Sequence, residues 1–600
     1  MTPMKQITEN LFWIEDTCSV YLVRRGDRAL LIDCGTRWVP SSLRDSAIQQ
    51  VDRILLTHFH RDQCSSAAEW QRQGTEVAIP LSERRLLEEA DLLRASYDQF
   101  DNYTSYYPGF TPLANLRPDL YARDYEAIEW MDLRFSVVPL PGHTFGSVGY
   151  FFAIDGKRVL ACGDLASHPE KLTNYYSAQW RYMDFQGHSN LLESLRFAAS
   201  LSPELVLPGH GAPFTPSGPL FADLSRNLER LFDLFHGRPY QYFKPRFREL
   251  TPHVYEVSNS GANAYIVRND EGYAVFIDCG YTATAPIHAN PHRFIDNLTS
   301  YAEQELGIRE VEWFLPSHYH DDHLAGYPAL KNRYGTRVLA TPELKDILEN
   351  PDRYEMPCLV PERLTVHRVI QRGESFEWRG VQFFMEQHPG QTLYHHLIWF
   401  EVDGTKFLSI GDNISGLSFT ENRDFIHSFI PKNRTPVSAY GDMPRQILDH
   451  SPDLILTGHG GAVPFDRAKV ERWKAWMDEW QQRFVRILDQ PHPNLGMDPH
   501  WVQFYPYKVR VRPTEVVTFQ ITITNHEPRE SRCVIAFRSL EGVRLSPETA
   551  ALSIPAQGNT GCSLTAQFPA VFSTHSLPVV ADVTWNGKHL GEIAEAIAYW

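Results

Sequence analysis

The chain has 600 residues, 43% of them apolar, and a formal net charge of −16 at pH 7. This length and apolar content can form several hydrophobic cores, so we expect two to four domains. The acidic balance argues against an extended nucleic-acid groove, because phosphate binding requires clustered lysine and arginine. The N-terminus lacks a signal-peptide pattern and no stretch is apolar enough to cross a bilayer, so we expect a cytoplasmic protein without a membrane partner.

Short apolar segments near the N-terminus predict three β-strands, and three similar segments recur in the middle of the chain. They are residues 11–14, 20–23, 29–32, 254–257, 264–267 and 274–277. Eight cysteines occur without a C-x-x-C spacing, and several lie in apolar runs. These cysteines are expected to be small buried hydrophobes and not a disulfide framework.

Two histidine-rich clusters each follow an apolar run. The downstream cluster has the pattern H-x-H-x-D-H and the upstream cluster has the pattern H-x-H-x-D-Q. Neutral imidazole and carboxylate are the ligands that Zn²⁺ and similar ions prefer, and a turn after a strand can direct such side chains at neighbouring ions. The downstream cluster is His318, His320, Asp322 and His323, and the upstream cluster is His58, His60, Asp62 and Gln63.

Other landmarks recur in the same order 245 to 249 residues later, although the two clusters themselves are 260 residues apart. Near-equal spacings across the landmarks indicate a duplicated domain of about 245 residues, a usual size for a single domain. The pairs are Asp33 and Asp278, His143 and Gln391, Asp164 and Asp412, and His210 and His459.

With these motifs, both halves resemble the metallo-β-lactamase fold superfamily of metal-dependent hydrolases, over roughly residues 5–240 and 250–490. The resemblance implies an α+β chain with two αββα sandwiches in tandem and metal sites at one edge of the sheets. We place the first domain at residues 1–240 and the second at 241–492.

In the downstream half the resemblance implies two neighbouring metal sites. His318 and His320 would bind the first ion, and Gln391 stands where a third histidine is usual. Asp322, His323 and His459 would bind the second ion, and Asp412 would bridge both. Because an amide is a weaker ligand than imidazole, first-site affinity should fall. The neighbouring histidines that are alternatives to Gln391 are His388 and His395.

In the upstream half the substitution lies at the other site. His58, His60 and His143 would complete the first site. Asp62, Asp164 and His210 would remain at the second, where Gln63 replaces a histidine. We therefore expect at least one ion in each half. Zinc is the expected metal, two ions per active domain, with iron or manganese as alternatives.

The expected activity is hydrolysis of an ester, thioester, lactone or related bond in a small molecule. Metal coordination lowers the pKa of water to near 7 and so supplies a hydroxide nucleophile. Asp322 and Asp412 are the predicted catalytic residues, which would position the nucleophile and relay its proton. The downstream half is the first candidate, since its cluster is intact.

An aromatic-rich segment precedes His143. It would either form a wall of a substrate pocket or seal the two halves against each other. In the second case the two halves would form an intrachain pseudo-dimer. Association of whole chains into a homo-oligomer is a further possibility. Its aromatic residues are Tyr97, Phe100, Tyr103, Tyr106, Tyr107 and Phe110.

Each half ends in an amphipathic segment that predicts a helix, the second with a stripe of Trp473, Trp476, Trp480 and Phe484 that we expect to pack on a sheet. Residues 491–494 are typical of a linker. Short strand-like runs then predict a β-sandwich at residues 493–600 that resembles immunoglobulin- or fibronectin-like modules. It lacks a catalytic cluster, so a packing or docking role is expected.

Three alternatives remain. A nuclease or phosphodiesterase of the same superfamily is disfavoured by the acidic charge and by the absence of a large insertion between Asp412 and His459. Related diiron redox enzymes carry a glutamate where His60 and His320 stand. A non-catalytic metal-binding scaffold is favoured by the two glutamine replacements.

Overall fold

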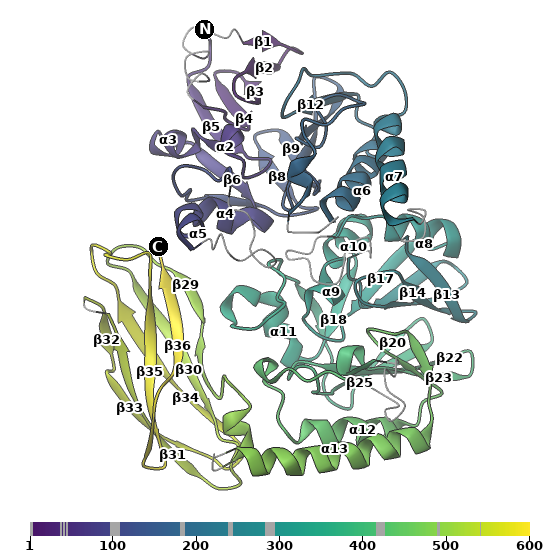
Figure 1. The fold of residues 1–600 in the computed structure, drawn as a ribbon, viewed down its shortest axis with the longest axis vertical. Coiled ribbons are helices and arrows are strands. Elements are labelled where there is room, and N and C mark those ends of the chain that lie inside the picture. The colour runs from purple at the N-terminus through teal and green to yellow at the C-terminus, as the bar shows by residue number, and fades with distance from the viewer. Residues whose placement is uncertain are drawn as a thin grey trace.

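The computed structural model describes residues 4–36, 39, 43, 46–96, 109–180, 186–237, 244–281, 294–415, 426–488, 492–540 and 542–600. Two α/β halves lie one above the other, and a region built of strands lies beside the lower half (Figure 1). The tandem arrangement expected from the repeated landmarks is therefore present. The domain boundaries at residues 240 and 492 stay predictions.

Two sheets form the upstream half. In the first sheet the strands follow chain order, antiparallel from β1 to β4 and parallel from β4 to β7. The second sheet has the order β12-β11-β10-β9-β8. The strands are β1 (Lys5–Gln6), β2 (Leu11–Glu15), β3 (Ser19–Arg25), β4 (Arg28–Ile32), β5 (Gln50–Leu55), β6 (Glu76–Pro80), β7 (Leu120–Ala122), β8 (Ala127–Trp130), β9 (Leu133–Pro139), β10 (Val148–Ile154), β11 (Lys157–Gly163) and β12 (Leu205–Pro208).

Three hydrophobic clusters stack this half into four layers. One cluster joins the inner faces of the two sheets, for example Leu30 of β4 with Tyr150 of β10. A second packs Trp70 and other helical residues on the outer face of the first sheet, and a third packs Leu191 and its neighbours on the second sheet. The result is an αββα sandwich. Its helices are α2 (Arg61–Cys64), α3 (Ala67–Arg72), α4 (Arg84–Glu88), α5 (Ala90–Ser96), α6 (Gln186–Ser200) and α7 (Ala222–His236).

The downstream half repeats this plan. Its first sheet runs from β13 to β19 in chain order, and its second has the order β20-β21-β22-β23-β26-β27, while β24 and β25 form a separate pair. The strands are β13 (Arg246–Thr251), β14 (Val254–Ser258), β15 (Ala264–Arg268), β16 (Tyr273–Ile277), β17 (Glu310–Leu315), β18 (Arg337–Ala340), β19 (Val366–Val369), β20 (Ser375–Trp378), β21 (Val381–Gln387), β22 (His396–Val402), β23 (Thr405–Ser409), β24 (Ile414–Ser415), β25 (Ile426–His427), β26 (Leu454–Leu456) and β27 (Ala462–Pro464).

The tryptophan stripe of the last helix of this half packs on its own sheet, as expected. Trp473 and Met477 are buried against Leu408 and Ile455, and Trp476 and Trp480 are partly buried beside them. The helices of this half are α8 (Leu298–Leu306), α9 (Asp321–Leu324), α10 (Tyr327–Tyr334), α11 (Pro342–Glu349), α12 (Ala439–His450) and α13 (Arg467–Ile487).

The described residues of the C-terminal β-domain form nine strands, β28 to β36. They form one sheet of order β28-β30-β34-β32 and a second of order β29-β36-β35-β31-β33, with a shared apolar core. The likeness to immunoglobulin or fibronectin modules stays a prediction. The strands are β28 (Val502–Tyr505), β29 (Lys508–Arg510), β30 (Val516–Thr524), β31 (Ser531–Ser539), β32 (Arg544–Ser546), β33 (Thr549–Ile554), β34 (Asn559–Gln567), β35 (Ser576–Trp585) and β36 (Lys588–Tyr599).

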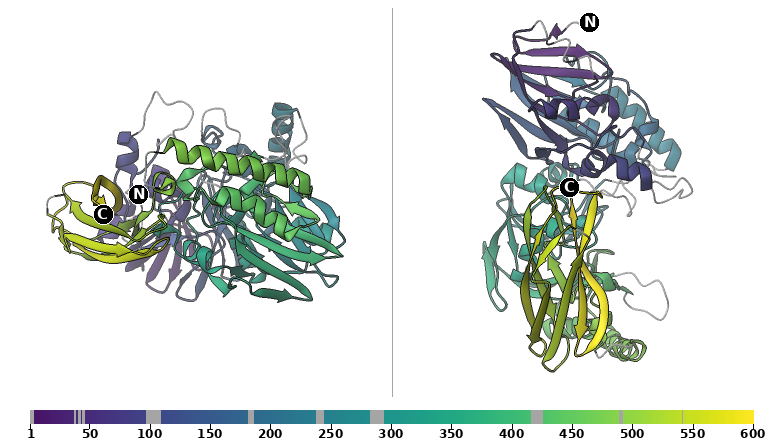
Figure 2. Two further views of the ribbon diagram at one scale, coloured as in Figure 1. Left: turned by 90° about the horizontal axis from the view of Figure 1, so that it is seen from below. Right: turned by 90° about the vertical axis from the view of Figure 1, so that its left-hand side faces the viewer.

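Direct contacts join the three parts. Between the halves, the hydroxyl of Tyr125 donates to the carbonyl oxygen of Phe294 at 2.8 Å, and Nδ2 of Asn297 donates to Glu193 at 3.0 Å. The C-terminal β-domain lies along the downstream half, and α13 leads into it (Figure 2). Whether the halves form a symmetric pseudo-dimer stays a prediction.

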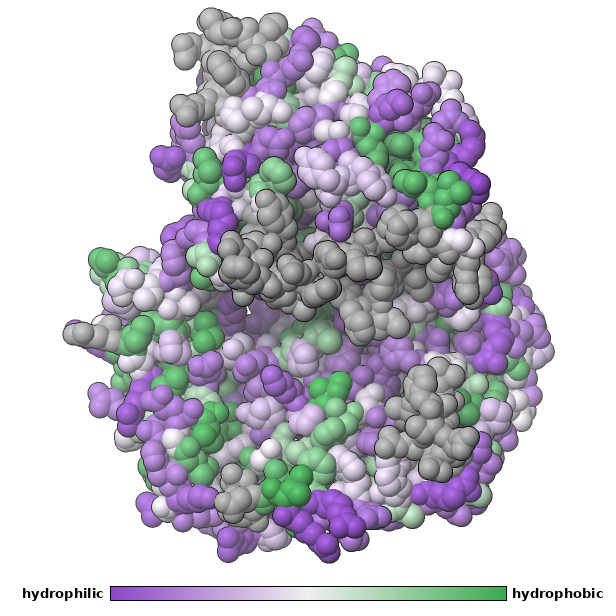
Figure 3. Space-filling view, in the orientation of Figure 1, coloured by the Kyte–Doolittle hydropathy of each residue, from purple (hydrophilic) through white to green (hydrophobic). Residues whose placement is uncertain are grey.

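Hydrophilic and hydrophobic residues intermix on the face drawn in Figure 3, and no broad apolar patch gathers among its coloured residues. All eight cysteines are free thiols, and Cys34, Cys162 and Cys279 are buried, which confirms their expected role as small hydrophobes. None of the helices among the described residues is both long enough and apolar enough to cross a membrane.

Candidate metal centres

Both histidine clusters lie where a buried parallel strand ends and a short helix begins. β5 ends at Leu55 and β17 at Leu315, and α2 and α9 begin at Arg61 and Asp321. His60 and His320 precede these helices with extended backbones. The rings of His58 and His60 lie 4.8 Å apart and those of His318 and His320 lie 4.5 Å apart, so the two histidines of each H-x-H pattern face one site. The next helical turn then presents the Asp62 or Asp322 side chain.

A buried aspartate braces each cluster from the preceding strand. Asp33 accepts hydrogen bonds from the backbone amide and hydroxyl of Thr57, both at 2.8 Å. Asp278 does the same for Ser317, both at 2.7 Å, and its Oδ2 also lies 2.9 Å from Nδ1 of His323. Such partners fix the orientation of a ligand ring.

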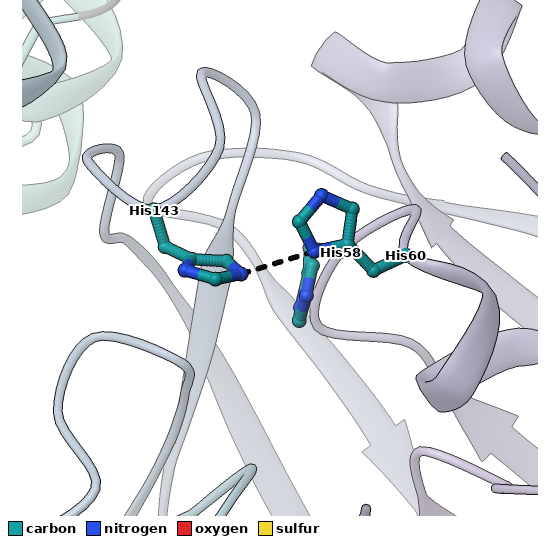
Figure 4. A group of neighbouring side chains, drawn as sticks. All are labelled: His58, His60 and His143. Carbon is teal, nitrogen blue, oxygen red and sulfur yellow. Dashed lines mark hydrogen bonds between the residues drawn. The ribbon is translucent and has the colours of Figure 1, made fainter. Parts of the chain in front are cut away.

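The upstream half brings three histidines together from two loops. Nε2 of His143 lies 3.0 Å from Nδ1 of His60, and the His58 ring lies 4.8 and 5.1 Å from the rings of His60 and His143 (Figure 4). All three are buried. Burial lowers the pKa of each imidazole, that of His60 to about 3, so all three are neutral at pH 7 and keep a free lone pair.

The other predicted ligands of this half lie next to the histidines. Asp164 lies 3.3 Å from Nε2 of His143, and His210 bridges the two carboxylates, 2.9 Å from Asp164 and 3.1 Å from Asp62. These hydrogen bonds, to Asp164 and then to Asp62, raise the pKa of His210 to about 10. Gln63 is fully buried, and neither of its amide atoms has a partner among the described residues.

The downstream half forms two ligand groups that share one residue. His318, His320 and Asp412 make one group, and Asp322, His323, Asp412 and His459 make the other, each with its ligand atoms within 4.8 Å of one another. Asp412 Oδ1 lies 3.0 Å from Nε2 of His323, and Oδ2 lies 3.3 Å from Nε2 of His459.

The electrostatics of this group keep Asp412 ionised. Burial raises the pKa of Asp412, but His323 and His459 outweigh that effect and hold it well below its usual range. Burial lowers the pKa of His459, but its hydrogen bonds to Asp322 and Asp412 raise it to about 10. In the metal-free protein His459 is therefore an imidazolium at pH 7, which a bound cation would deprotonate.

Gln391 occupies the position of the third first-site ligand. Its Nε2 donates to Oδ2 of Asp412 at 3.0 Å, while its Oε1 is buried and has no partner among the described residues. The alternative histidines do not join a ligand group of the described chain. Nδ1 of His388 pairs with Gln446, and Nε2 of His395 accepts from the backbone amide of Asp412.

The donor set fits divalent metal ions. Nε2 of His58 and Nε2 of His318 are buried and lack a hydrogen-bond partner among the described residues. An unpaired buried polar group costs about 1–3 kcal/mol, so such atoms are retained for a ligand or a function. Imidazole nitrogen and carboxylate oxygen are the usual ligands of zinc and similar ions.

A cavity of about 400 Å³ opens onto the upstream histidines. Phe110 lies 5.5 Å from the His60 ring and 6.5 Å from that of Tyr176, so two aromatic residues flank this cavity. Of the predicted aromatic segment only Phe110 can be placed, because Tyr97, Phe100, Tyr103, Tyr106 and Tyr107 lie outside the described residues. Tyr176 was not predicted, since nothing in the local sequence marks it.

The two αββα sandwiches with His/Asp groups at a sheet edge are typical of metal-dependent hydrolases. The family model of the metallo-beta-lactamase superfamily matches residues 13–210 and 258–459. The chain therefore belongs to this superfamily and contains two copies of its domain, as the repeated landmarks predicted.

Curated relatives include hydroxyacylglutathione hydrolases. The protein from Aeromonas salmonicida is 24% identical over 203 residues, which are 31% of this chain and 66% of the relative. That from Albidiferax ferrireducens is 26% identical over 167 residues, 27% of this chain and 50% of the relative. The chain thus spans about one half to two thirds of these relatives. A solved metallo-beta-lactamase family protein from Thermus thermophilus is 23% identical and covers 39% of this chain and 78% of its own, with a TM-score of 0.29.

Proposed function

We propose that this protein is a metal-dependent hydrolase whose main catalytic site lies in the downstream half. One observation carries the proposal: Asp412 belongs to both downstream ligand groups. A carboxylate that belongs to two adjacent ligand groups could bridge two ions held close together, as in two-metal hydrolytic sites. Zinc is the expected metal, with iron or manganese as alternatives.

In this site His318, His320 and Asp412 would hold one ion, and Asp322, His323, Asp412 and His459 the other. The bound ions would supply a water-derived nucleophile at neutral pH and an electrophile for the substrate oxygen. Asp412, whose side chain is 3% exposed, contributes a fixed negative charge. The side chain of Asp322 is 16% exposed, so it reaches solvent and can move a proton between the site and water.

The two glutamine replacements predict the order in which the metal sites of each half fill. Gln391 directs its amide nitrogen at Asp412, so the group of Asp322, His323, Asp412 and His459 should fill before the group of His318 and His320. In the upstream half the order reverses, because His58, His60 and His143 are complete, whereas Gln63 replaces a ligand beside Asp62, Asp164 and His210. Each half is thus expected to hold at least one ion.

The substrate class is an ester, thioester, lactone or related bond of a small molecule. The hydroxyacylglutathione hydrolases among the relatives support this class, although the chain spans only part of each of them. The aromatic flanks of the upstream cavity, Phe110 and Tyr176, would suit an apolar portion of a substrate bound at the upstream site.

A matched pair of double variants tests the proposal. His320→Ala with Asp322→Ala should abolish hydrolysis of an ester, thioester and lactone panel with Zn²⁺, Mn²⁺ or Fe²⁺. His60→Ala with Asp62→Ala makes the equivalent change upstream and should leave the main activity. Unchanged turnover in the downstream variant would refute the assignment. Turnover of a phosphodiester instead would favour a nuclease-like activity, and metal binding without turnover would favour a scaffold.

A further inference from the structure

We infer that Asn433 is a positioning residue for His320, and that the C-terminal β-domain holds Asn433 in place through a buried ion pair between Arg434 and Asp498. The inference rests on the metal site proposed for the downstream half. It gives the C-terminal β-domain a role in that site, although none of its residues belongs to a ligand group of the described chain.

Asn433 is fully buried and lies next to the His320 ring. Its Nδ2 lies 3.4 Å from Nε2 of His320, and its Oδ1 lies 3.4 Å from the hydroxyl of Tyr319. Its backbone oxygen accepts a hydrogen bond from Leu393 at 3.0 Å. Asn433 therefore contacts both the cluster loop and the loop that carries Gln391.

This contact can select the ring nitrogen that faces the ions. In the orientation drawn, Nδ2 of Asn433 can only donate to Nε2 of His320, which places the ring proton on Nδ1; upstream, the equivalent Nδ1 of His60 faces His143. A half-turn of the Asn433 amide exchanges its oxygen and nitrogen, and only the hydrogen-bond partners assign which atom is which. In that orientation the oxygen accepts Nε2–H of His320, the amide nitrogen donates to Tyr319, and the imidazole keeps its Nδ1 lone pair.

The next residue anchors this turn to the C-terminal β-domain. Arg434 has a left-handed backbone, φ 68°, and its side chain is 8% exposed. Its guanidinium donates to Asp498 at 3.0 Å, to Gln503 at 2.7 Å and to the backbone oxygen of His500 at 3.0 Å. A planar guanidinium with several fixed acceptors allows little movement, so the turn is held rigidly.

A row of aromatic rings makes a second connection between the ligand loop and the C-terminal β-domain. The ring of Tyr319, next to His320, lies 5.8 Å from that of Tyr394; Tyr394 lies 6.2 Å from Tyr354; and Tyr354 lies 5.6 Å from Tyr505 of β28. The hydroxyl of Tyr505 also donates to Asp346 at 3.3 Å. Packed rings thus connect the ligand loop to the same strand of the C-terminal β-domain.

The experiment uses the full chain with the upstream site disabled by His58→Ala and His60→Ala. Co²⁺ titration, followed by the visible ligand-field bands, reports the downstream site. Asn433→Leu, which keeps the branched skeleton but removes the polar atoms, should weaken Co²⁺ binding about 10–100-fold, the usual effect of losing the partner of a ligating histidine. Asn433→Asp retains an acceptor for Nε2–H and should keep most of the affinity and the band positions.

The anchor is tested by two matched substitutions in the C-terminal β-domain. Asp498 and Glu527 are both carboxylates with 3% exposed side chains, but Glu527 pairs with Arg529 and Trp585 of its own domain. Asp498→Asn should weaken Co²⁺ binding about tenfold and raise deuterium uptake of peptides covering residues 317–324 and 389–396. Glu527→Gln should do neither.

The outcomes separate the two proposals. No Co²⁺ bands in the parent protein would overturn the proposed metal site itself. If the parent protein shows Co²⁺ bands, and Asn433→Leu shows bands of the same strength and position at the same Co²⁺ concentrations, the role of Asn433 is overturned. Equal Co²⁺ affinity and equal deuterium uptake in Asp498→Asn and Glu527→Gln would overturn the role of the C-terminal β-domain.

Discussion

Gln391 donates a hydrogen bond from Nε2 to Oδ2 of Asp412 at 3.0 Å. The amide thereby occupies an oxygen of the carboxylate that both downstream ligand groups share. An imidazole at this position would offer a lone pair to an ion, whereas an amide N–H consumes a lone pair of the shared ligand. We therefore expect this contact to lower the metal affinity of the first downstream site, that of His318, His320 and Asp412.

Gln391→His should therefore add about one bound ion per chain, because it completes a site of three imidazoles and a carboxylate. Metal analysis of the protein purified with excess zinc measures the change. Gln387→His, an exposed position at the end of β21, is the control and should leave metal content unchanged. Equal metal content in the two variants would contradict the prediction.

Gln63→Met should stabilise the metal-free protein. Gln63 is fully buried and its amide atoms have no partner among the described residues, and such a group costs about 1–3 kcal/mol. Methionine fills a similar volume without that cost, so the melting temperature of the upstream half should rise by about 2–4 °C. Calorimetry with a chelator present checks this, with the exposed Gln73→Met as control. A lower melting temperature would show that the amide has a partner.

Gly458→Ala should disable the downstream site without unfolding the chain. A Cβ at this position would overlap Oδ1 of Asp412 and lie 2.8 Å from Cε1 of His323. Displacement of a catalytic carboxylate by about 1 Å can cost on the order of 10²-fold in rate. Hydrolysis assays and Co²⁺ titration measure the loss. Gly218→Ala, where the Cβ meets open space, is the control and should behave like the parent.

The metal-free upstream half should lose stability as pH rises from about 7 to 10. Asp164 and Asp62 raise the pKa of His210 to about 10 in the folded protein, above the usual value of about 6.5 in an unfolded chain. A group whose pKa is higher in the folded than in the unfolded state stabilises the protein fully at a pH below its unfolded-state pKa. This stabilisation disappears as the pH rises to the folded-state pKa. Thermal unfolding with a chelator measures the slope, and His210→Gln should flatten it.

The metal affinity of the upstream half should change with pH in the opposite direction to the stability of the metal-free protein. Ions require the neutral imidazole of His210, so metal affinity should increase over the same pH range and binding should release protons. Isothermal titration in buffers of different ionisation enthalpy counts those protons, in a chain whose downstream site is disabled by His320→Ala and Asp322→Ala so that His459 does not contribute. A proton count of zero at pH 7 would mean that His210 stays outside the metal site.

Several features follow from the sequence alone because they depend on short spacings. A turn at the end of a strand can direct two alternate side chains at one ion, so the H-x-H spacing by itself predicts that His58 pairs with His60 and His318 with His320. The repeated landmarks likewise predicted two domains of one family, which the family match at residues 13–210 and 258–459 confirms. Apolar runs in the sequence likewise predicted the strands that lead into the two histidine clusters.

Only the tertiary structure decided contacts between segments far apart in the chain. The residue type of Gln391 marks it as a weak ligand, but packing directs its nitrogen at Asp412 and turns His388 and His395 to other partners. Asn433 and Arg434 carry no local signal, because their partners, His320 and Asp498, lie 113 and 64 residues away. Side-chain type and spacing constrain one loop; the packing of whole domains determines which loops meet.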